Sequence, residues 1–415
     1  ETSARVLYAD SNTRLAFDSA TSFDGTISDL ITFKAWDRNG VKSISSSPTL
    51  TGSLDTSGWS FGVTISADGN TAFVADSLSG LHIINISNPA SPSLTGTYDT
   101  SGNAEDVVLS ADGNTAFVAD RAHGLDIIDV SNPASPTLTG NLDTSSNAYK
   151  LKLSADGNTA FVADGGSGLQ IIDISESFAN GDASVATSPS ITGTYNTSGN
   201  AYGLTLSADG NTAFVADRDS GLQIIDVSNK ASPTLTATLN TSGSAYSVTL
   251  SADGNTVFIA DGSSGLQVID VSNPTSPSLT ATLDTLGEAY EVTLSADDDT
   301  AYVADGSGGF RIIDVSTPAS PSLTFTLDTD YDHHGVTISA DGNTAFVGGY
   351  EYGLHIIDIS NPANPSLTAT LDTFGYSDGV TLSADGNTAY VADRGGGLRI
   401  MDVSNPASPS LTATL

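Results

Sequence analysis

Residues 207–229 read SADGNTAFVADRDSGLQIIDVSN, and eight close copies of this stretch, itself included, fill the chain from about residue 63 to its last residue. The first Asp of the turn marks the period in each copy: Asp68, Asp112, Asp156, Asp209, Asp253, Asp297, Asp341 and Asp385. The step is 44 residues, except for one of 53 between Asp156 and Asp209. A unit of this length is one supersecondary element that buries its apolar faces only by stacking on copies of itself.

The unit that begins at Ala201 predicts four short antiparallel strands, at residues 202–207, 212–216, 222–228 and 235–239. Asp209-Gly210 accepts positive φ and closes a tight hairpin between the first two strands. The second strand is apolar at consecutive positions, as in a sheet covered on both faces. The sequence therefore predicts an all-β fold, a β-propeller with eight regular four-stranded blades of 44-residue period. A β-solenoid is the alternative, but its coils are usually shorter and lack a hairpin in every unit.

The first 55 residues follow the same frame only in outline, so we divide the chain into residues 1–55 and a propeller at residues 56–415. The N-terminal segment is either a degenerate repeat that forms a ninth blade or a docking segment. The alternative is that residues 1–46 are the tail of a preceding domain, since a chain that opens at Glu1 suggests an excised segment. The frame starts with a first strand and ends with a fourth, so we expect no offset in which one terminus completes the blade of the other.

Composition narrows the class of partner. The chain has 13 Lys and Arg against 48 Asp and Glu, a formal charge of -35, which repels nucleic acids and anionic membrane surfaces. No run of about 18 apolar residues is present, so we expect no membrane insertion. The absence of Cys removes disulfides and thiolate metal sites together.

The third-strand phrase, Leu-x-Ile-Ile-Asp-Val-Ser-Asn-Pro, carries a family resemblance. It stands at residues 125–133, 266–274 (with Val for one Ile) and 398–406 (with Met for one Ile), and it resembles the LVIVD repeat of bacterial and archaeal surface proteins. The resemblance implies a secreted or surface-displayed propeller, often part of a larger protein, and it carries no catalytic residues to transfer. Asn85, Lys230 and Gly349 depart from the phrase or its frame.

An Asp closes nearly every second strand: Asp76, Asp120, Asp164, Asp217, Asp261, Asp305 and Asp393. A residue used in almost every unit normally serves the frame, so we interpret these carboxylates as acceptors of hydrogen bonds in turns. No Asp-x-Asp-x-Asp-Gly loop is present, and we expect no metal or cofactor, with Ca²⁺ at a loop as the alternative.

The position before the first strand varies most between copies, and in a propeller it lies near the mouth of the central channel. We take the following residues as a candidate ligand site: Trp59, Glu105, Asp106, Lys150, Tyr202, Glu291, His333, His334 and Asp378. Phe61, Tyr149, Tyr246 and Tyr290 belong to the same column. A weaker hypothesis is that His333 and His334 gather a metal with Asp330, Asp332 and Asp378.

No nucleophile elbow, zinc-protease motif or phosphate loop occurs, so we do not expect an enzyme. The near-identity of the copies favours an extracellular or cell-surface structural or adhesive protein, a rigid scaffold for contact with other surface proteins. Self-assembly head to tail into filaments or arrays is part of this hypothesis, because residues 48–54 would carry unpaired strand edges if residues 1–55 did not complete the ring. The alternative function is a ligand-binding or hydrolytic propeller that acts at the channel mouth.

Overall fold

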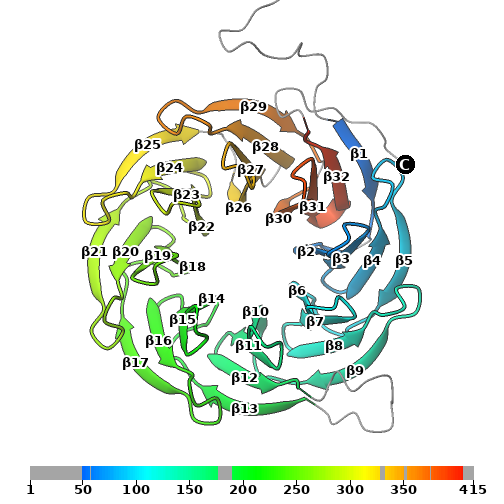
Figure 1. The fold of residues 1–415 in the computed structure, drawn as a ribbon, viewed down its shortest axis with the longest axis horizontal. Helices are drawn as coiled ribbons and strands as arrows, with labels where there is room; N and C mark the ends of the chain where they lie inside the picture. Colours follow the sequence, from blue (N-terminus) through cyan, green and yellow to red (C-terminus); the bar gives the residue numbers. More distant parts are fainter. Residues whose placement is uncertain are drawn as a thin grey trace, which may run out of the picture. The chain divides into compact units, whose positions relative to one another are not determined.

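The computed structural model describes residues 49–56, 58–175, 189–327, 332–349, 353–373 and 375–404. These residues belong to one compact unit, Ser45–Leu415, whereas the unit Glu1–Ile44 lies outside the described residues. The described chain folds into eight four-stranded antiparallel sheets arranged around a central axis as the blades of a propeller (Figure 1). A short 3-10 turn, η1 (Arg394–Gly396), is its one helical element. None of the described helices has the length and apolar character to cross a membrane.

Each of the first four blades begins with its innermost strand and ends with its outermost strand (Figure 1). Blade 1 contains β2 (Gly62–Ile65), β3 (Thr71–Ala75), β4 (Leu81–Asn85) and β5 (Ser93–Tyr98). Blade 2 contains β6 (Asp106–Leu109), β7 (Thr115–Ala119), β8 (Leu125–Asp129) and β9 (Thr137–Leu142). Blade 3 contains β10 (Ala148–Leu153), β11 (Thr159–Asp164), β12 (Leu169–Asp173) and β13 (Ser190–Tyr195). Blade 4 contains β14 (Gly203–Leu206), β15 (Thr212–Ala216), β16 (Leu222–Asp226) and β17 (Thr234–Leu239).

The other four blades complete the ring. Blade 5 contains β18 (Ser247–Leu250), β19 (Thr256–Ala260), β20 (Leu266–Asp270) and β21 (Ser278–Leu283). Blade 6 contains β22 (Glu291–Leu294), β23 (Thr300–Ala304), β24 (Phe310–Asp314) and β25 (Ser322–Leu327). Blade 7 contains β26 (His333–Ile338), β27 (Thr344–Gly349), β28 (Gly353–Asp358) and β29 (Ser366–Leu371). Blade 8 contains β30 (Ser377–Leu382), β31 (Thr388–Asp393), β32 (Gly397–Asp402) and β1 (Thr49–Leu54).

Blade 8 joins the two ends of the propeller. Its outermost strand, β1, comes from the N-terminal side of the chain and pairs antiparallel with β32, with Leu54 opposite Leu398 (Figure 1). The expectation of no terminal offset is therefore wrong. Because β30 contacts β2 directly, the ring closes with eight blades and has no place for a ninth. Residues 1–48 lie outside the described residues, so their role as a docking segment stays a prediction.

The hairpin prediction is confirmed in the unit that begins at Ala201. The strands β14 to β17 lie where the four strands were expected, within one or two residues at each end. Gly210 has φ +68°, and Asp209 accepts hydrogen bonds from Ser207 Oγ at 2.6 Å and from the Asn211 amide at 3.0 Å. The Asp-Gly turn thus fixes the hairpin through its own side chain as well as through the glycine.

The core is a set of apolar clusters between neighbouring blades. Between blades 4 and 5, Phe214 and Ile224 pack with Val248 and Ile259, and all four are buried. Each middle strand contacts a neighbouring blade on both faces, which is why its sequence is apolar at consecutive positions.

Candidate functional site

One position per blade stands at the start of the innermost strand, beside the central axis, and contacts between neighbouring blades bring these positions together (Figure 1). The position lies just before or within the start of each innermost strand and holds Phe61, Glu105, Tyr149, Tyr202, Tyr246, Tyr290, His334 and Asp378. The loop after the second strand of one blade forms a β-bridge to the residue that precedes this position in the next blade, as Arg218 does with Ala245. Three of these loops carry an arginine: Arg121, Arg218 and Arg394. We call these eleven residues the rim.

The aromatic side chains of blades 3 to 7 form a continuous chain of ring contacts. Tyr149 stacks on Tyr202 with centroids 4.1 Å apart, and Tyr202 meets Tyr246 edge to face at 5.8 Å. Tyr246 lies 5.1 Å from Tyr290, which stacks on His334 at 4.2 Å. Contacts of this kind stabilise by about 0.5 to 1.5 kcal/mol each beyond their buried area, so the arc is pre-ordered.

Arg218 holds the middle of this arc. Its guanidinium lies 4.9 Å from the Tyr202 ring and 5.2 Å from the Tyr246 ring, and Nη2 donates to the Tyr246 hydroxyl at 3.2 Å. Burial and the neighbouring Tyr149 raise the pKa of Tyr202 to about 12. The phenol is therefore neutral at physiological pH and can donate a hydrogen bond to a ligand.

The arc through blades 8, 1 and 2 is charged. Arg394 forms an ion pair with Asp378 and lies 5.0 Å from the Phe61 ring and 5.8 Å from the Trp59 ring. Arg121 forms an ion pair with Glu105 and lies 5.7 Å from the Phe61 ring. Burial raises the pKa of Glu105, and Arg121 opposes that shift. Trp59 is 57% exposed and is the most accessible aromatic side chain of this arc.

Three of the candidate residues directly follow a rim residue in the sequence and make contacts between neighbouring innermost strands. Asp106 Oδ2 accepts from the Leu151 amide at 3.2 Å, and Glu291 Oε2 accepts from the Val336 amide at 2.9 Å. Lys150 Nζ lies 3.7 Å from Asp106 Oδ1, and the Asp106 charge is the main cause that raises the pKa of Lys150. Asp106 and Glu291 thus serve the frame, whereas the Lys150 side chain, 58% exposed, faces solvent.

His333 does not belong to the rim. It is fully buried, and its Nε2 lies 3.3 Å from Nδ1 of His355, while His334 turns to Tyr290. A Cβ at Gly349 would lie 3.2 Å from the His355 ring, so the imidazole pair occupies the space that the second-strand Asp takes in other blades. Asp330 lies outside the described residues, and within them no three His, Asp or Glu side chains converge on a metal position. Among the described residues the two histidines thus contact different partners, and a metal site that includes Asp330 stays a hypothesis.

The repeat phrase identifies the family. The LVIVD repeat matches residues 63–100, 101–144, 151–197, 198–241, 242–285, 287–329, 335–373 and 375–415. The chain belongs to the LVIVD-repeat family. No curated protein matches it in sequence.

Solved structures share the fold of this LVIVD-repeat propeller at low identity. Chaetomium thermophilum Sqt1 bound to the N-terminus of the ribosomal protein L10 is 12% identical, with a TM-score of 0.69 over 83% of this chain and 97% of that chain. Saccharomyces cerevisiae Sqt1 is 10% identical, with a TM-score of 0.69 over 86% and 98% of the two chains. The C-terminal WD40 domain of Sif2 is 13% identical, with a TM-score of 0.67 over 87% and 99%. These likenesses concern the fold alone.

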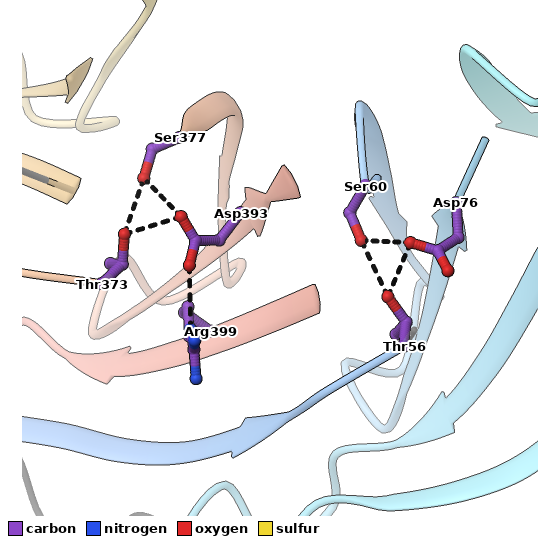
Figure 2. A network of polar contacts seen from close by, with 7 residues as sticks. All are labelled: Thr56, Ser60, Asp76, Thr373, Ser377, Asp393 and Arg399. Atoms are coloured by element: carbon purple, nitrogen blue, oxygen red, sulfur yellow. Dashed lines mark hydrogen bonds and ion pairs between the residues drawn. The ribbon is translucent and has the colours of Figure 1, made fainter. Parts of the chain in front are cut away.

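The second-strand carboxylates of the LVIVD propeller tie neighbouring blades together. Asp76 Oδ1, in blade 1, accepts hydrogen bonds from Thr56 Oγ1 and Ser60 Oγ, both at 2.6 Å (Figure 2). Thr56 follows the outermost strand of blade 8, so the bond crosses the blade interface. Seven blades contain such a pair with a Thr 20 residues upstream. The interpretation of these Asp residues as turn acceptors therefore holds, with the addition that they join blades.

The three rim arginines were missed by the sequence reasoning. They occupy the position after the second-strand Asp, where the described copies otherwise hold Ser77, Gly165, Gly262 and Gly306. The departure from a small residue was the available signal. That signal did not indicate which side chain each arginine contacts, because the contacted side chain is the rim residue of the same or the next blade.

Proposed function

We propose that the chain is a rigid scaffold that binds another protein through the rim and the adjoining Trp59, whose ring lies 5.8 Å from Arg394. The observation that carries this proposal is the contrast between the rim and the frame. The cross-blade Thr-Asp pair recurs in seven blades, whereas the rim position holds Phe, Glu, Tyr, His or Asp in different blades. Residues that vary on a repeated frame are free to specify a partner.

The chemistry of the rim suits a protein surface. Tyr, Trp and Arg are the side chains that contribute most to binding at protein interfaces. The rim side chains are ordered by contacts with one another, such as Tyr149 on Tyr202 and Arg394 on Phe61. Binding therefore costs less side-chain entropy than it would for free side chains. Sqt1, a neighbour in fold, is known in complex with the N-terminus of ribosomal protein L10, which adds support.

We place this binding outside the cell or at its surface, in an adhesive or structural role. The resemblance of the repeat to that of bacterial and archaeal surface proteins and the formal charge of -35 support that location. The strand that motivated head-to-tail assembly is paired within its own ring, because β1 is the fourth strand of blade 8. The partner we propose is accordingly a different surface protein, and assembly of copies stays a prediction.

Binding rather than catalysis is the function we favour for the channel mouth. Glu105 is paired with Arg121, and Asp378 with Arg394. A hydrolytic pair needs one carboxyl free to donate a proton and one free to act as base or nucleophile. The two ion pairs engage oxygens of both carboxylates, so neither side chain is free for such a role.

The test uses site-specific photo-cross-linking in a cell-surface extract. A photoreactive residue replaces Trp59 in the channel-mouth column or, as control, Leu279 on an outermost strand, which is 51% exposed. We expect a discrete cross-linked protein from the Trp59 position only. The purified partner should bind at least about tenfold more weakly to Trp59→Ala, ~1.4 kcal/mol, and equally well to Leu279→Ala. Equal cross-linking from both positions, or unchanged binding by Trp59→Ala and Arg218→Ala, would refute the proposal.

A further inference from the structure

In most blades a hydrogen-bond donor lies beside the second-strand Asp. The residue six positions after that Asp, in the third strand, provides it. Arg311 Nε donates to Asp305 Oδ2 at 3.0 Å in blade 6, and Arg399 Nε donates to Asp393 Oδ2 at 3.0 Å in blade 8 (Figure 2). The corresponding residue of blade 1, His82, lies 3.7 Å from Asp76. Blades 3, 4 and 5 have Gln170, Gln223 and Gln267 at this position.

Blade 2 is the exception, because it has a second carboxylate there. Asp126 takes the position of the donor, and both Asp120 and Asp126 are buried, at 0% and 2% exposure. Asp120 Oδ1 accepts from Thr100 Oγ1 at 2.8 Å, while Oδ2, the atom that meets arginine in blades 6 and 8, has no hydrogen-bond partner. The negative charge of Asp126 acts on the Asp120 carboxylate, which the Gly102 amide also approaches.

The comparison with blade 3 separates this site from an ordinary buried Asp. Asp164 also has an Oδ2 without a hydrogen-bond partner. Its neighbour Gln170 is neutral: it donates to the Ser167 carbonyl at 2.9 Å, accepts from Thr194 at 2.7 Å and, with Ser167, lowers the pKa of Asp164 against the effect of burial. Among the described blades, two carboxyl groups occupy this pair of positions only in blade 2, and two negative charges in a buried site require a cation or a proton.

Further oxygen atoms surround the pair. Asn141 Nδ2 donates to Asp126 Oδ1 at 2.5 Å and to the His123 carbonyl oxygen at 3.2 Å, so two oxygen atoms already face this amide. An amide can present either its nitrogen or its oxygen to such a neighbour, since the two atoms are assigned by their hydrogen bonds. With its oxygen turned inward, Asn141 would complete a set of carboxylate, amide and main-chain oxygens. Hard cations such as Ca²⁺ select this set of ligands.

We propose that blade 2 binds one Ca²⁺ ion, or a similarly hard divalent cation, between Asp120 and Asp126, with Asn141 and the His123 carbonyl as the neutral ligands. Ca²⁺ replaces the arginine that neutralises the same carboxylate in blades 6 and 8. His123 and Asn141 are exposed, so the ion has a short path from solvent. The negative charge of the exposed Asp99 also acts on Asp120.

The test compares the full chain with three variants after removal of metal by a chelator, at high salt and about pH 8, where both carboxyls are ionised. Asp126→Gln introduces the residue of blades 3 to 5, and Asn141→Thr introduces the residue that stands at this position in blades 4 and 5. Asp270→Asn is the control, because it removes one charge from an exposed turn in blade 5. Circular dichroism checks that each variant is folded.

We expect calorimetric titration with CaCl₂ to give one site more in the parent chain than in Asp126→Gln, with a Kd on the order of 10⁻⁴ to 10⁻³ M or tighter. The unfolding temperature should rise with Ca²⁺ in the parent and in Asp270→Asn, rise less in Asn141→Thr, and stay constant in Asp126→Gln. An equal response of the parent and Asp126→Gln would overturn the proposal. So would an unfolding temperature that rises on acidification but not with Ca²⁺, because the two carboxyls would then share a proton.

Discussion

Replacing Arg311 by Met should destabilise the propeller strongly, because it leaves the Asp305 carboxylate buried without its cation. Asp305 is 0% exposed and Arg311 4% exposed, and their Oδ2 and Nε atoms are 3.0 Å apart. Met retains most of the side-chain volume, so the loss is mainly electrostatic. Removing one partner of a buried ion pair costs about 3 to 5 kcal/mol.

The matched substitution Arg311→Gln should cost less than half as much. Gln stands at this position in blades 3 to 5, where Gln223 donates to the Ser220 carbonyl at 3.0 Å beside a buried Asp217. The Gly308 carbonyl occupies the place of the Ser220 carbonyl in blade 6, so Gln has an acceptor there.

The pH dependence gives a second measure of the same effect. Burial raises the pKa of Asp305, and Arg311 opposes that shift. Without Arg311, the folded state binds a proton more tightly than the unfolded state, so stability falls as pH rises from about 4 through the raised pKa. The difference in unfolding free energy between Arg311→Met and the parent should therefore be smaller at pH 5 than at pH 8. An ordinary Asp carboxyl titrates near pH 4, so pH 5 is about one unit above that value and pH 8 is far above it.

The assay is denaturant and thermal unfolding of the parent and both variants at the two pH values. Lys152→Met, which removes an exposed cation, is the control for the change in net charge. If Arg311→Met costs no more than Arg311→Gln at pH 8, or if its cost does not depend on pH, Asp305 is not a buried charge that Arg311 compensates.

Three further predictions concern closure, the turn and the rim. Deleting residues 1–54 removes β1 and exposes the edge of β32, so the unfolding temperature should drop. Deleting residues 1–46 keeps β1 and should leave the unfolding temperature unchanged. Equal unfolding temperatures for the two deletions would contradict the pairing of β1 in blade 8. Gly210→Val should lower the free energy of unfolding by about 1 to 2 kcal/mol, because residue 210 has a positive φ. Gly210→Asp should lower it less, since Asp298 adopts φ +60° at the same position of blade 6. Thermal unfolding that ranks the two variants the other way would argue against backbone strain. Tyr202→Phe should remove one phenol that ionises near pH 12 in an ultraviolet titration, and loss of a phenol titrating near 10 instead would place Tyr202 in solvent.

Most of the local structure could be predicted from the sequence. The expected strand at residues 212–216 agrees with β15, Thr212–Ala216, and the positive φ of Gly210 follows from the Asp-Gly turn. These features depend on neighbours within a few residues, such as Ser207 and Asn211 around Asp209. The repetition of the unit supplied the rest, because eight stacked units bury what one unit leaves exposed.

The closure of the ring could not be read in the same way. The phrase at residues 49–54 resembles every other fourth strand, and the sequence does not say whether it pairs with its own unit or with β32. The number of blades that fit around the axis decides this, and that number depends on how neighbouring sheets pack. The strand at residues 49–54 was therefore assigned to the N-terminal segment, residues 1–55, although it pairs with β32 in blade 8.

The sequence by itself determined the strands, the hairpins, the family and the column of positions at the channel mouth. The tertiary structure decided which of those positions act together. Tyr149 and Tyr202 are 53 residues apart in the chain and 4.1 Å apart in the rim. Asp106 and Glu291, from the same variable column, instead bond to the main chain of the next blade. The physical reason is that a repeat fixes the position of each residue within its own blade, whereas contact between side chains depends on the residue that the neighbouring blade presents.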